Sequence, residues 1–270
     1  MWMAGDGTLE HWEAPGDGTR LLALGSTRVP GNLRWLASVD RGLLAADESG
    51  RALRLPWEKD TPPLQGAWLS IPPPALGAAE RNGLVALASG TNGVWLLRTS
   101  GTNPPTLAGH FAGALDARDA GFVASLVCVG DGLHGLKFLD VSDPADPQLV
   151  GVFAPKPGFV AERLAISTTL IAVGGGQEVR LLDAGDPRHA VISATRPLPG
   201  RVRHMTVANL RLWVACGPAG FVELDLGKGL EVLSRRPTRG TAEAVAVDGA
   251  RVFVAEGSGG WRELRPADRP

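Results

Sequence analysis

The chain repeats one short pattern seven times at a spacing of about 42 residues, and this repeat restricts the folds that are open to it. Each copy contains an apolar run, a glycine-rich loop and then two apolar residues three positions apart. The first members of these pairs follow one another at intervals of 43, 42, 42, 43, 42 and 40 residues. The pairs are Leu9/Trp12, Ala52/Leu55, Val94/Leu97, Leu136/Leu139, Val179/Leu182, Phe221/Leu224 and Trp261/Leu264. Such regular spacing is typical of a chain built from copies of one supersecondary unit.

Each unit is predicted to contain four short strands. A loop such as Gly130-Asp131-Gly132 separates two runs of about five residues, which indicates a β-hairpin. An alternating strand precedes most hairpins, and a fourth strand, such as residues 148–153, follows. With 36 glycines and 21 prolines in 270 residues the chain is rich in turns, which excludes an all-helical protein. Four strands in about 42 residues predict a β-propeller blade.

The apolar pairs explain why such units should close into a ring. Residues an odd number apart on a strand point to opposite faces of the sheet, so Leu136 and Leu139 need cover on both sides. Neighbouring sheets provide that cover. The sequence therefore predicts an all-β fold, a β-propeller of four-stranded antiparallel blades that forms a single domain over residues 1–270.

The blade count has two solutions. We expect six innermost strands, near Leu33, Leu76, Leu115, Leu164, Met205 and Val245, seven central hairpins and six outer strands. Seven blades result if each hairpin belongs to its own blade, and this is the preferred arrangement. Six result if residues 21–24 complete the last blade as its outer strand and leave a surplus hairpin at the amino terminus.

One segment resembles a known repeat. Residues 135–153, GLKFLDVSDPADPQLVGVF, are similar to the repeat of the LVIVD family, and LLDAGDP and FVELDLGKG are weaker copies. The likeness is sharpest over residues 121–190, and the first three copies lack the Asp-Pro turn. The resemblance implies a β-propeller of the kind common in secreted or surface-associated prokaryotic proteins, here a bacterial one. It implies no catalytic motif and supplies no site residues.

Composition narrows the possible partners and cofactors. The 27 basic and 28 acidic side chains give a net charge of −1, so no overall field favours nucleic acid. No apolar run is long enough to cross a membrane and no signal peptide opens the chain, so we expect a soluble protein whose compartment stays undetermined. Cys128 and Cys216 lie in apolar runs and are expected to be small buried residues. The five histidines are scattered, so no metal site and no cofactor are expected.

The face on which the loops gather is the expected binding site. There the connections between blades meet the hairpin loops around the central channel. Residues 188–239 hold nine basic and three acidic side chains. Eight arginines are candidate binding residues, which we call the basic crescent: Arg28, Arg34, Arg196, Arg201, Arg203, Arg235, Arg236 and Arg239. They are either a site for a carboxylate- or phosphate-bearing partner or, as the excess of 23 arginines over 4 lysines favours, a solvated surface.

Acidic residues of the same face have two interpretations. Glu162 and Glu243 stand at equivalent positions before two innermost strands, where they would form an acid/base pair, a cation site or, as we favour, ion pairs with arginines. Asp6, Asp131 and Glu256 are expected to stabilise their own turns.

The function that fits these features best is a non-catalytic scaffold that binds a protein partner through the loop face, for example as a subunit of a cell-envelope complex. The alternative is a propeller hydrolase of lactonase type, with a divalent cation held by acids at the channel mouth. No set of nucleophile, base and orienting residue stands out, so the sequence leans against an enzyme without excluding one. The identity of the partner and the oligomeric state stay open.

Overall fold

A computed structural model describes residues 2–5, 8–13, 22–28, 33–39, 42–47, 49, 51–56, 68–99, 105–154, 158–248 and 251–264 of the chain. Within these residues there are 26 β-strands and two short 3-10 helices, η1 (Pro187–His189) and η2 (Gly257–Gly259). No helix among them is long and apolar enough to span a membrane.

The strands form seven antiparallel sheets, and in each sheet a strand pairs with its neighbours in sequence. The first sheet has three strands: β1 (Trp2–Gly5), β2 (Thr8–Glu13) and β3 (Leu22–Arg28). The second and third have four: β4 (Leu33–Val39), β5 (Gly42–Asp47), β6 (Arg51–Pro56) and β7 (Trp68–Ser70), then β8 (Gly77–Arg81), β9 (Leu84–Ala88), β10 (Val94–Arg98) and β11 (Thr106–Phe111).

The remaining four sheets continue the same order. They contain β12 (Asp119–Val123), β13 (Leu126–Gly130), β14 (Leu136–Asp140) and β15 (Gln148–Phe153); β16 (Arg163–Ser167), β17 (Leu170–Gly175), β18 (Glu178–Asp183) and β19 (Val191–Pro197); β20 (His204–Ala208), β21 (Arg211–Ala215), β22 (Phe221–Asp225) and β23 (Glu231–Arg236); and β24 (Ala244–Asp248), β25 (Arg251–Ala255) and β26 (Trp261–Leu264).

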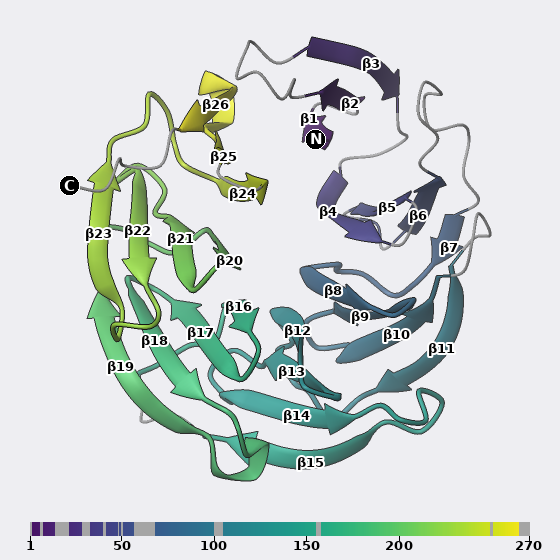
Figure 1. The fold of residues 1–270 in the computed structure, drawn as a ribbon. Helices are drawn as coiled ribbons and strands as arrows, with labels where there is room; N and C mark the ends of the chain where they lie inside the picture. Colours follow the sequence, from purple (N-terminus) through teal and green to yellow (C-terminus); the bar gives the residue numbers. More distant parts are fainter. Residues whose placement is uncertain are drawn as a thin grey trace.

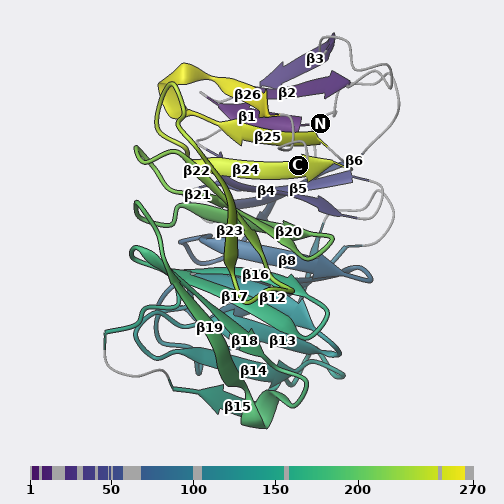
Figure 2. The same ribbon diagram turned by 60° about the vertical axis from the view of Figure 1, so that its left-hand side comes forward.

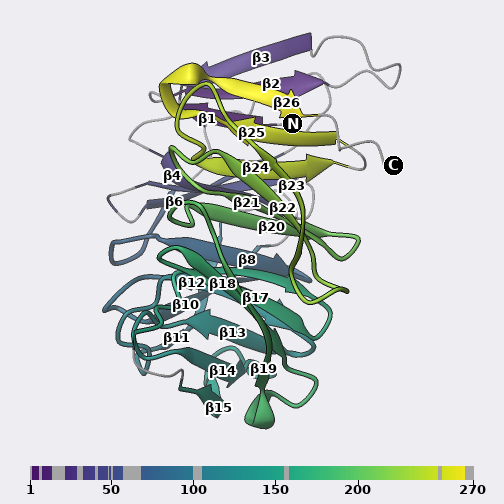
Figure 3. The same ribbon diagram turned by 90° about the vertical axis from the view of Figure 1, so that its left-hand side faces the viewer.

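The sheets stand around a common axis. Strands β4, β8, β12, β16, β20 and β24 lie nearest the centre, and β11, β15, β19 and β23 lie at the periphery (Figure 1). Rotated views show the sheets stacked one after another, with the first and last sheets on the same side of the molecule (Figures 2 and 3). The predicted all-β fold of four-stranded antiparallel units is therefore confirmed.

Three details refine the sequence-based prediction. Strand β3 pairs with β2, so it belongs to the first sheet, as expected if each hairpin has its own sheet. The first sheet lacks an innermost strand and the last lacks an outer strand among the described residues. The expected innermost strand near Leu115 was placed too early, because β12 begins at Asp119 and Leu115 lies in an exposed loop before it.

Paired apolar residues pack against different neighbours, as their spacing predicts. Leu136 packs in a cluster with the β16–β19 sheet, whereas Leu139 packs with the β8–β11 sheet, and neither side chain is exposed to solvent. Phe221 and Leu224 divide in the same way between the β24–β26 sheet and the β16–β19 sheet. In the part of the chain whose side chains are described, the four sheets from β8 to β23 are thus covered on both faces.

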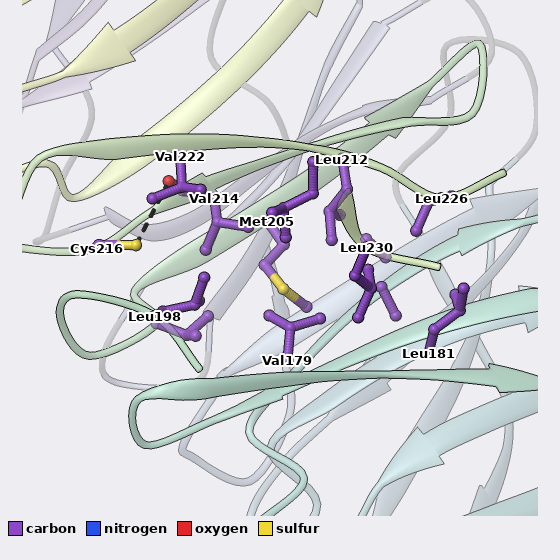
Figure 4. Close-up of a cluster of buried hydrophobic side chains, with 14 residues drawn as sticks. Val179, Leu181, Leu198, Met205, Leu212, Val214, Cys216, Val222, Leu226 and Leu230 are labelled. Carbon is purple, nitrogen blue, oxygen red and sulfur yellow. Dashed lines mark hydrogen bonds between the residues drawn. The ribbon is translucent and has the colours of Figure 1, made fainter. Parts of the chain in front are cut away.

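Figure 4 shows one of these interfaces, between the β16–β19 and β20–β23 sheets. Val179 and Leu181 from one sheet face Met205, Leu212 and other apolar residues from the next. Cys216 belongs to this cluster, and burial raises the pKa of its thiol to about 11. The thiol of Cys128 is also buried and its pKa is raised, so both cysteines are the small buried residues that the sequence predicts.

The turns that contain Asp-Pro pack against the preceding sheet at a glycine. A Cβ atom on Gly109 of β11 would lie 1.8 Å from the carbonyl oxygen of Pro144. A Cβ on Gly151 of β15 would lie 3.0 Å from the carbonyl oxygen of Pro187. Both glycines lie beside a β-bulge in the outer strand. The outer strands therefore need glycine where the next turn crosses them.

Replacing Gly109 with alanine is expected to destabilise the protein. The added methyl group must displace backbone atoms of the turn that contains Pro144, so we expect a loss of about 1 to 3 kcal/mol in the free energy of unfolding. Gly185→Ala is the matched control, because the nearest atom to its Cβ would be a carboxylate oxygen of Asp183 at 3.4 Å. Urea denaturation of both variants tests this, and equal midpoints would contradict the packing described here.

Candidate functional site

The loop face is held together by backbone hydrogen bonds between adjacent sheets. The hairpin loop of one sheet pairs with the connection that leads into the next sheet, as in the bridge between Gly132 and Ala161. The N–H of Ala161 donates to the carbonyl of Gly132 at 2.8 Å, and the reverse bond is 3.3 Å long. The same bridge joins Gly90 to Ala117 and Gly217 to Ala242. The hairpin loops and the connections therefore share one face, as the sequence predicts.

Asp131 and Glu256 close their own turns through backbone hydrogen bonds, as expected, and their carboxylates also act outside those turns. The carboxylate of Asp131 is buried and accepts the N–H of Asp116, in the connection that leads into its sheet, at 2.6 Å. It also forms a buried ion pair with Lys137. Glu256 likewise accepts the N–H of Arg239 at 3.1 Å. These carboxylates hold the connections in place; Asp6 lies outside the described residues.

Charged residues of alternating sign occupy one repeated position at the mouth of the channel. Immediately before four consecutive innermost strands stand Arg118, Glu162, Arg203 and Glu243. In each case the backbone N–H bonds to the second strand of the same sheet, at 2.7 to 2.9 Å. The backbone thus fixes the position while the side chain stays free to vary.

These side chains form ion pairs around the mouth. Arg118 pairs with Asp116 at 2.6 Å, and Glu162 pairs with Arg201 at 2.5 Å. Arg203 Nε lies 3.9 Å from a carboxylate oxygen of Glu243. Both acids that were candidates for catalysis or cation binding therefore face arginines. Over the described residues, no group of three histidine, cysteine or acidic side chains is placed to hold a metal ion.

The eight arginines of the basic crescent do not all come together. Arg201 and Arg203 lie at the channel mouth, whereas the guanidinium of Arg196 donates to the carbonyl of Leu230 in the next sheet. Three others lie on or after the next outer strand. Arg235 and Arg236 are on β23 and Arg239 follows it, and Arg235 and Arg239 are exposed. Arg28 ends β3 and Arg34 lies in β4, but their side chains are outside the described part of the structure.

Three polar residues that the sequence analysis did not single out cross between the innermost strands. Asp119 accepts the N–H of Leu164 at 2.9 Å, and Arg163 donates to the carbonyl of Arg203 at 2.8 Å. His204 accepts the N–H of Val245 through Nδ1 at 3.4 Å. Asp119, Arg163 and His204 are each the first residue of an innermost strand. Each side chain thus satisfies a backbone group on the free edge of the next strand around the channel.

Burial shifts the pKa values of two of these residues. Removal from water raises the pKa of Asp119 to about 6, against the opposing effects of the Leu164 N–H, Arg163 and the Ala120 N–H. Removal from water, together with nearby Arg163, lowers the pKa of His204 to about 4. The innermost strands therefore contain an acid that is half-protonated in mildly acidic solution and a histidine that is neutral at pH 7.

Two exposed leucines lie on the same face. Leu115 is 58% exposed and Leu133 is 68% exposed, although both belong to a chain whose other leucines are mainly in the core. Leu115 precedes Asp116, and Leu133 follows Gly132. A Cβ on Gly132 would lie 3.1 Å from the Cβ of Asp116, so the two loops are in close contact. The sequence analysis missed this apolar pair.

No family model and no curated protein matches the chain. Solved structures do resemble it. The WD40 β-propeller domain of Doa1 matches with a TM-score of 0.77 at 13% identity, over 96% of this chain and 86% of that one. A chain of the mitotic checkpoint complex matches with a TM-score of 0.73 at 14% identity, over 99% of this chain and 86% of that one. Sqt1 of Saccharomyces cerevisiae matches with a TM-score of 0.67 at 13% identity, over 98% of this chain and 92% of that one.

The fold is a β-propeller. These identities are too low to carry more than the fold, since propellers of one architecture serve many functions. Apart from the strand that was expected near Leu115, the described central strands and hairpin loops have the places that the repeat predicts. Its function must be argued from the loop face itself.

Replacing Asp119 with asparagine is expected to change how stability depends on pH. In the folded protein the carboxyl titrates near pH 6, and in the unfolded chain near pH 4, so folding binds a proton between these values. The contribution of Asp119 to stability therefore falls as the pH rises from about 4 to 6, by up to about 3 kcal/mol. We expect Asp119→Asn to gain stability relative to the wild type over this window.

Thermal unfolding of both proteins at a series of pH values measures this difference. Loss of one hydrogen bond lowers the stability of the variant by the same amount at every pH. The quantity to compare is therefore the slope of stability against pH. His204 contributes with the opposite sign, because its stabilising effect is lost as the pH falls from about 6.5 to 4. It is present in both proteins and cancels in the comparison. Parallel curves for the two proteins would show that Asp119 is ionised normally.

Proposed function

We propose that this propeller is a non-catalytic scaffold that binds a protein partner through its loop face. The observation that carries the proposal is the exposure of Leu115 and Leu133 beside the ion pairs of Arg118, Glu162 and Arg201. An apolar centre surrounded by charged residues is the usual composition of a protein interface. A partner that covers the two leucines would remove apolar surface from water, which favours association.

The acids at the channel mouth favour the scaffold over a hydrolase. A lactonase-type mechanism needs carboxylates that are free to bind a cation. Glu162 and Glu243 instead lie against Arg201 and Arg203, which neutralise their charge.

The family and cellular context are part of the proposal. We infer that the chain is an LVIVD-repeat propeller of bacterial origin that serves as a subunit of a cell-envelope complex. The support is the Asp-Pro turn, which in two sheets packs against the glycine of the preceding outer strand. A repeat motif that has this structural role is expected to recur in related chains together with that glycine.

Affinity capture with matched variants tests the scaffold. The full chain is immobilised and incubated with an extract of the organism that encodes it, in parallel with Leu133→Asp and with Leu149→Asp. Leu149 is 46% exposed on β15, away from the loop face, and serves as the control. We expect one protein to be retained by the wild type and the control and lost by Leu133→Asp, at about tenfold lower recovery or less.

The captured protein must also bind the purified propeller directly. Binding measured by calorimetry should weaken with Arg201→Glu, because this change removes an ion pair and reverses a charge in the interface. Capture that is lost only with Leu149→Asp would place the interface on the outer strands and contradict the proposal. Turnover of lactones by the purified chain would do so as well.

A further inference from the structure

We propose that the loop face recognises a short extended segment of the partner that carries an apolar side chain next to carboxylates. This inference rests on the proposed function and names the chemistry of its partner. The apolar side chain lies against Leu115 and Leu133, and the carboxylates lie near Arg201 and Arg203.

A continuous set of contacts joins the leucines to the arginines. Asp131 bonds to the backbone of Asp116, next to Leu115, and its neighbour Gly132 bridges to Ala161. Glu162 follows Ala161 and pairs with Arg201 at 2.5 Å. The apolar pair and the nearest arginine are thus fixed relative to each other by the same hydrogen bonds that join the sheets. A partner meets this surface already formed, which lowers the cost of binding.

The charges that remain on this side of the ring are positive. Arg163 donates to the carbonyl oxygens of Arg203 and Glu162 and has no carboxylate within ion-pair distance among the described residues. Arg235 and Arg239 are exposed and form no ion pair with another described residue. Arg201 is 59% exposed even with its partner in place. The excess of guanidinium groups favours carboxylates, which they bind through two parallel hydrogen bonds.

The alternation of sign favours a peptide over nucleic acid. A polyanion presents a phosphate at every step and would place some of these against Asp116, Glu162 and Glu243. A peptide can place single carboxylates beside the arginines without placing negative charges beside the acidic residues of the propeller. The leucines add a contact that a phosphate backbone does not use. We therefore assign the surface to an acidic peptide segment.

Selection from a random peptide library on the purified full chain tests this inference. We expect the enriched peptides to place a leucine, isoleucine, phenylalanine or tryptophan within two residues of an aspartate or glutamate. Synthetic copies are labelled and titrated by fluorescence anisotropy. Leu133→Ser and Arg203→Glu should each raise the dissociation constant about tenfold, whereas Leu149→Ser and Arg188→Glu, on the outer strand β15 and in η1, should leave it unchanged.

Exchanging the charges of the peptide and the propeller provides a direct control. A peptide whose acid is replaced by lysine should bind Arg203→Glu more tightly than it binds the wild type. Enriched peptides without acids, or binding that is insensitive to Leu133 and Arg203, would overturn the inference. Tighter binding of a labelled single-stranded oligonucleotide that depends on the same arginines would also overturn it.

The two proposals fail in different ways. If a captured protein depends on Leu133 but the selected peptides do not compete with it, the scaffold stands and the acidic segment is wrong. If the peptides bind as expected while captured proteins do not depend on the loop face, the peptide site stands and the scaffold role is wrong.

Discussion

The four sheets from β8 to β23 are apolar on both faces, and the remaining features of the fold follow from that constraint. The pair of apolar residues three positions apart places one side chain in each of two interfaces, as Leu136 and Leu139 do. A single sheet with this pattern would expose one of them. Stacking alone would still leave two outer faces, whereas a ring leaves none, so burial of both residues requires neighbours on each side. The apolar pairs therefore determine the architecture, and the turns adjust to it, with glycine at 109 and 151 where a turn crosses the preceding sheet.

Polar groups then link sheets that the apolar contacts bring together. The backbone bridges at Gly90, Gly132 and Gly217 connect each hairpin loop to the next connection, and buried Asp131 holds the connection that enters its own sheet. Around the channel, Asp119 and His204 satisfy backbone N–H groups of the next innermost strand. These hydrogen bonds join residues that are far apart in the sequence. They specify the order and the angle of neighbouring sheets more than they add to stability, because each replaces hydrogen bonds that the unfolded chain makes with water.

The sequence predicted most of the strands because the apolar repeat is local, and it failed where a side chain acts on a distant segment. The backbone of Asp131 closes its own glycine-rich turn, as the neighbouring sequence suggests, but its carboxylate also binds the N–H of Asp116, fifteen residues away in another loop. Asp119, Arg163 and His204 escaped notice because a polar residue at the start of an alternating strand does not reveal that the next strand has a free edge. Leu115 was taken as part of an innermost strand, since leucine is usually buried, and only the structure shows it in the exposed loop before β12. Arg196 and Arg201 of the basic crescent are close in sequence, yet the fold sends Arg196 toward Leu230 and brings Arg201 to Glu162.

At the position that carries the charges at the channel mouth, the repeated interaction is made by the backbone, although the carboxylate of Glu162 also accepts the N–H of Gly176 at 3.3 Å. Arg118, Glu162, Arg203 and Glu243 each donate the same backbone N–H to the second strand, whatever their side chains. In the core, by contrast, a charged residue requires a second residue of opposite charge. Glu223 on β22 is buried and pairs with Arg211 on β21 at 2.5 Å. The β12–β15 sheet has Phe138 and Leu126 at the corresponding positions. Substitution of one member of that pair would leave a buried charge without its partner. At the mouth of the channel the side chains of Arg203 and Glu243 remain 45% and 46% exposed, so these residues can change to suit a partner while the propeller remains intact. Recognition is therefore expected at the repeat positions whose side chains the architecture does not use, and these lie beside the two exposed leucines.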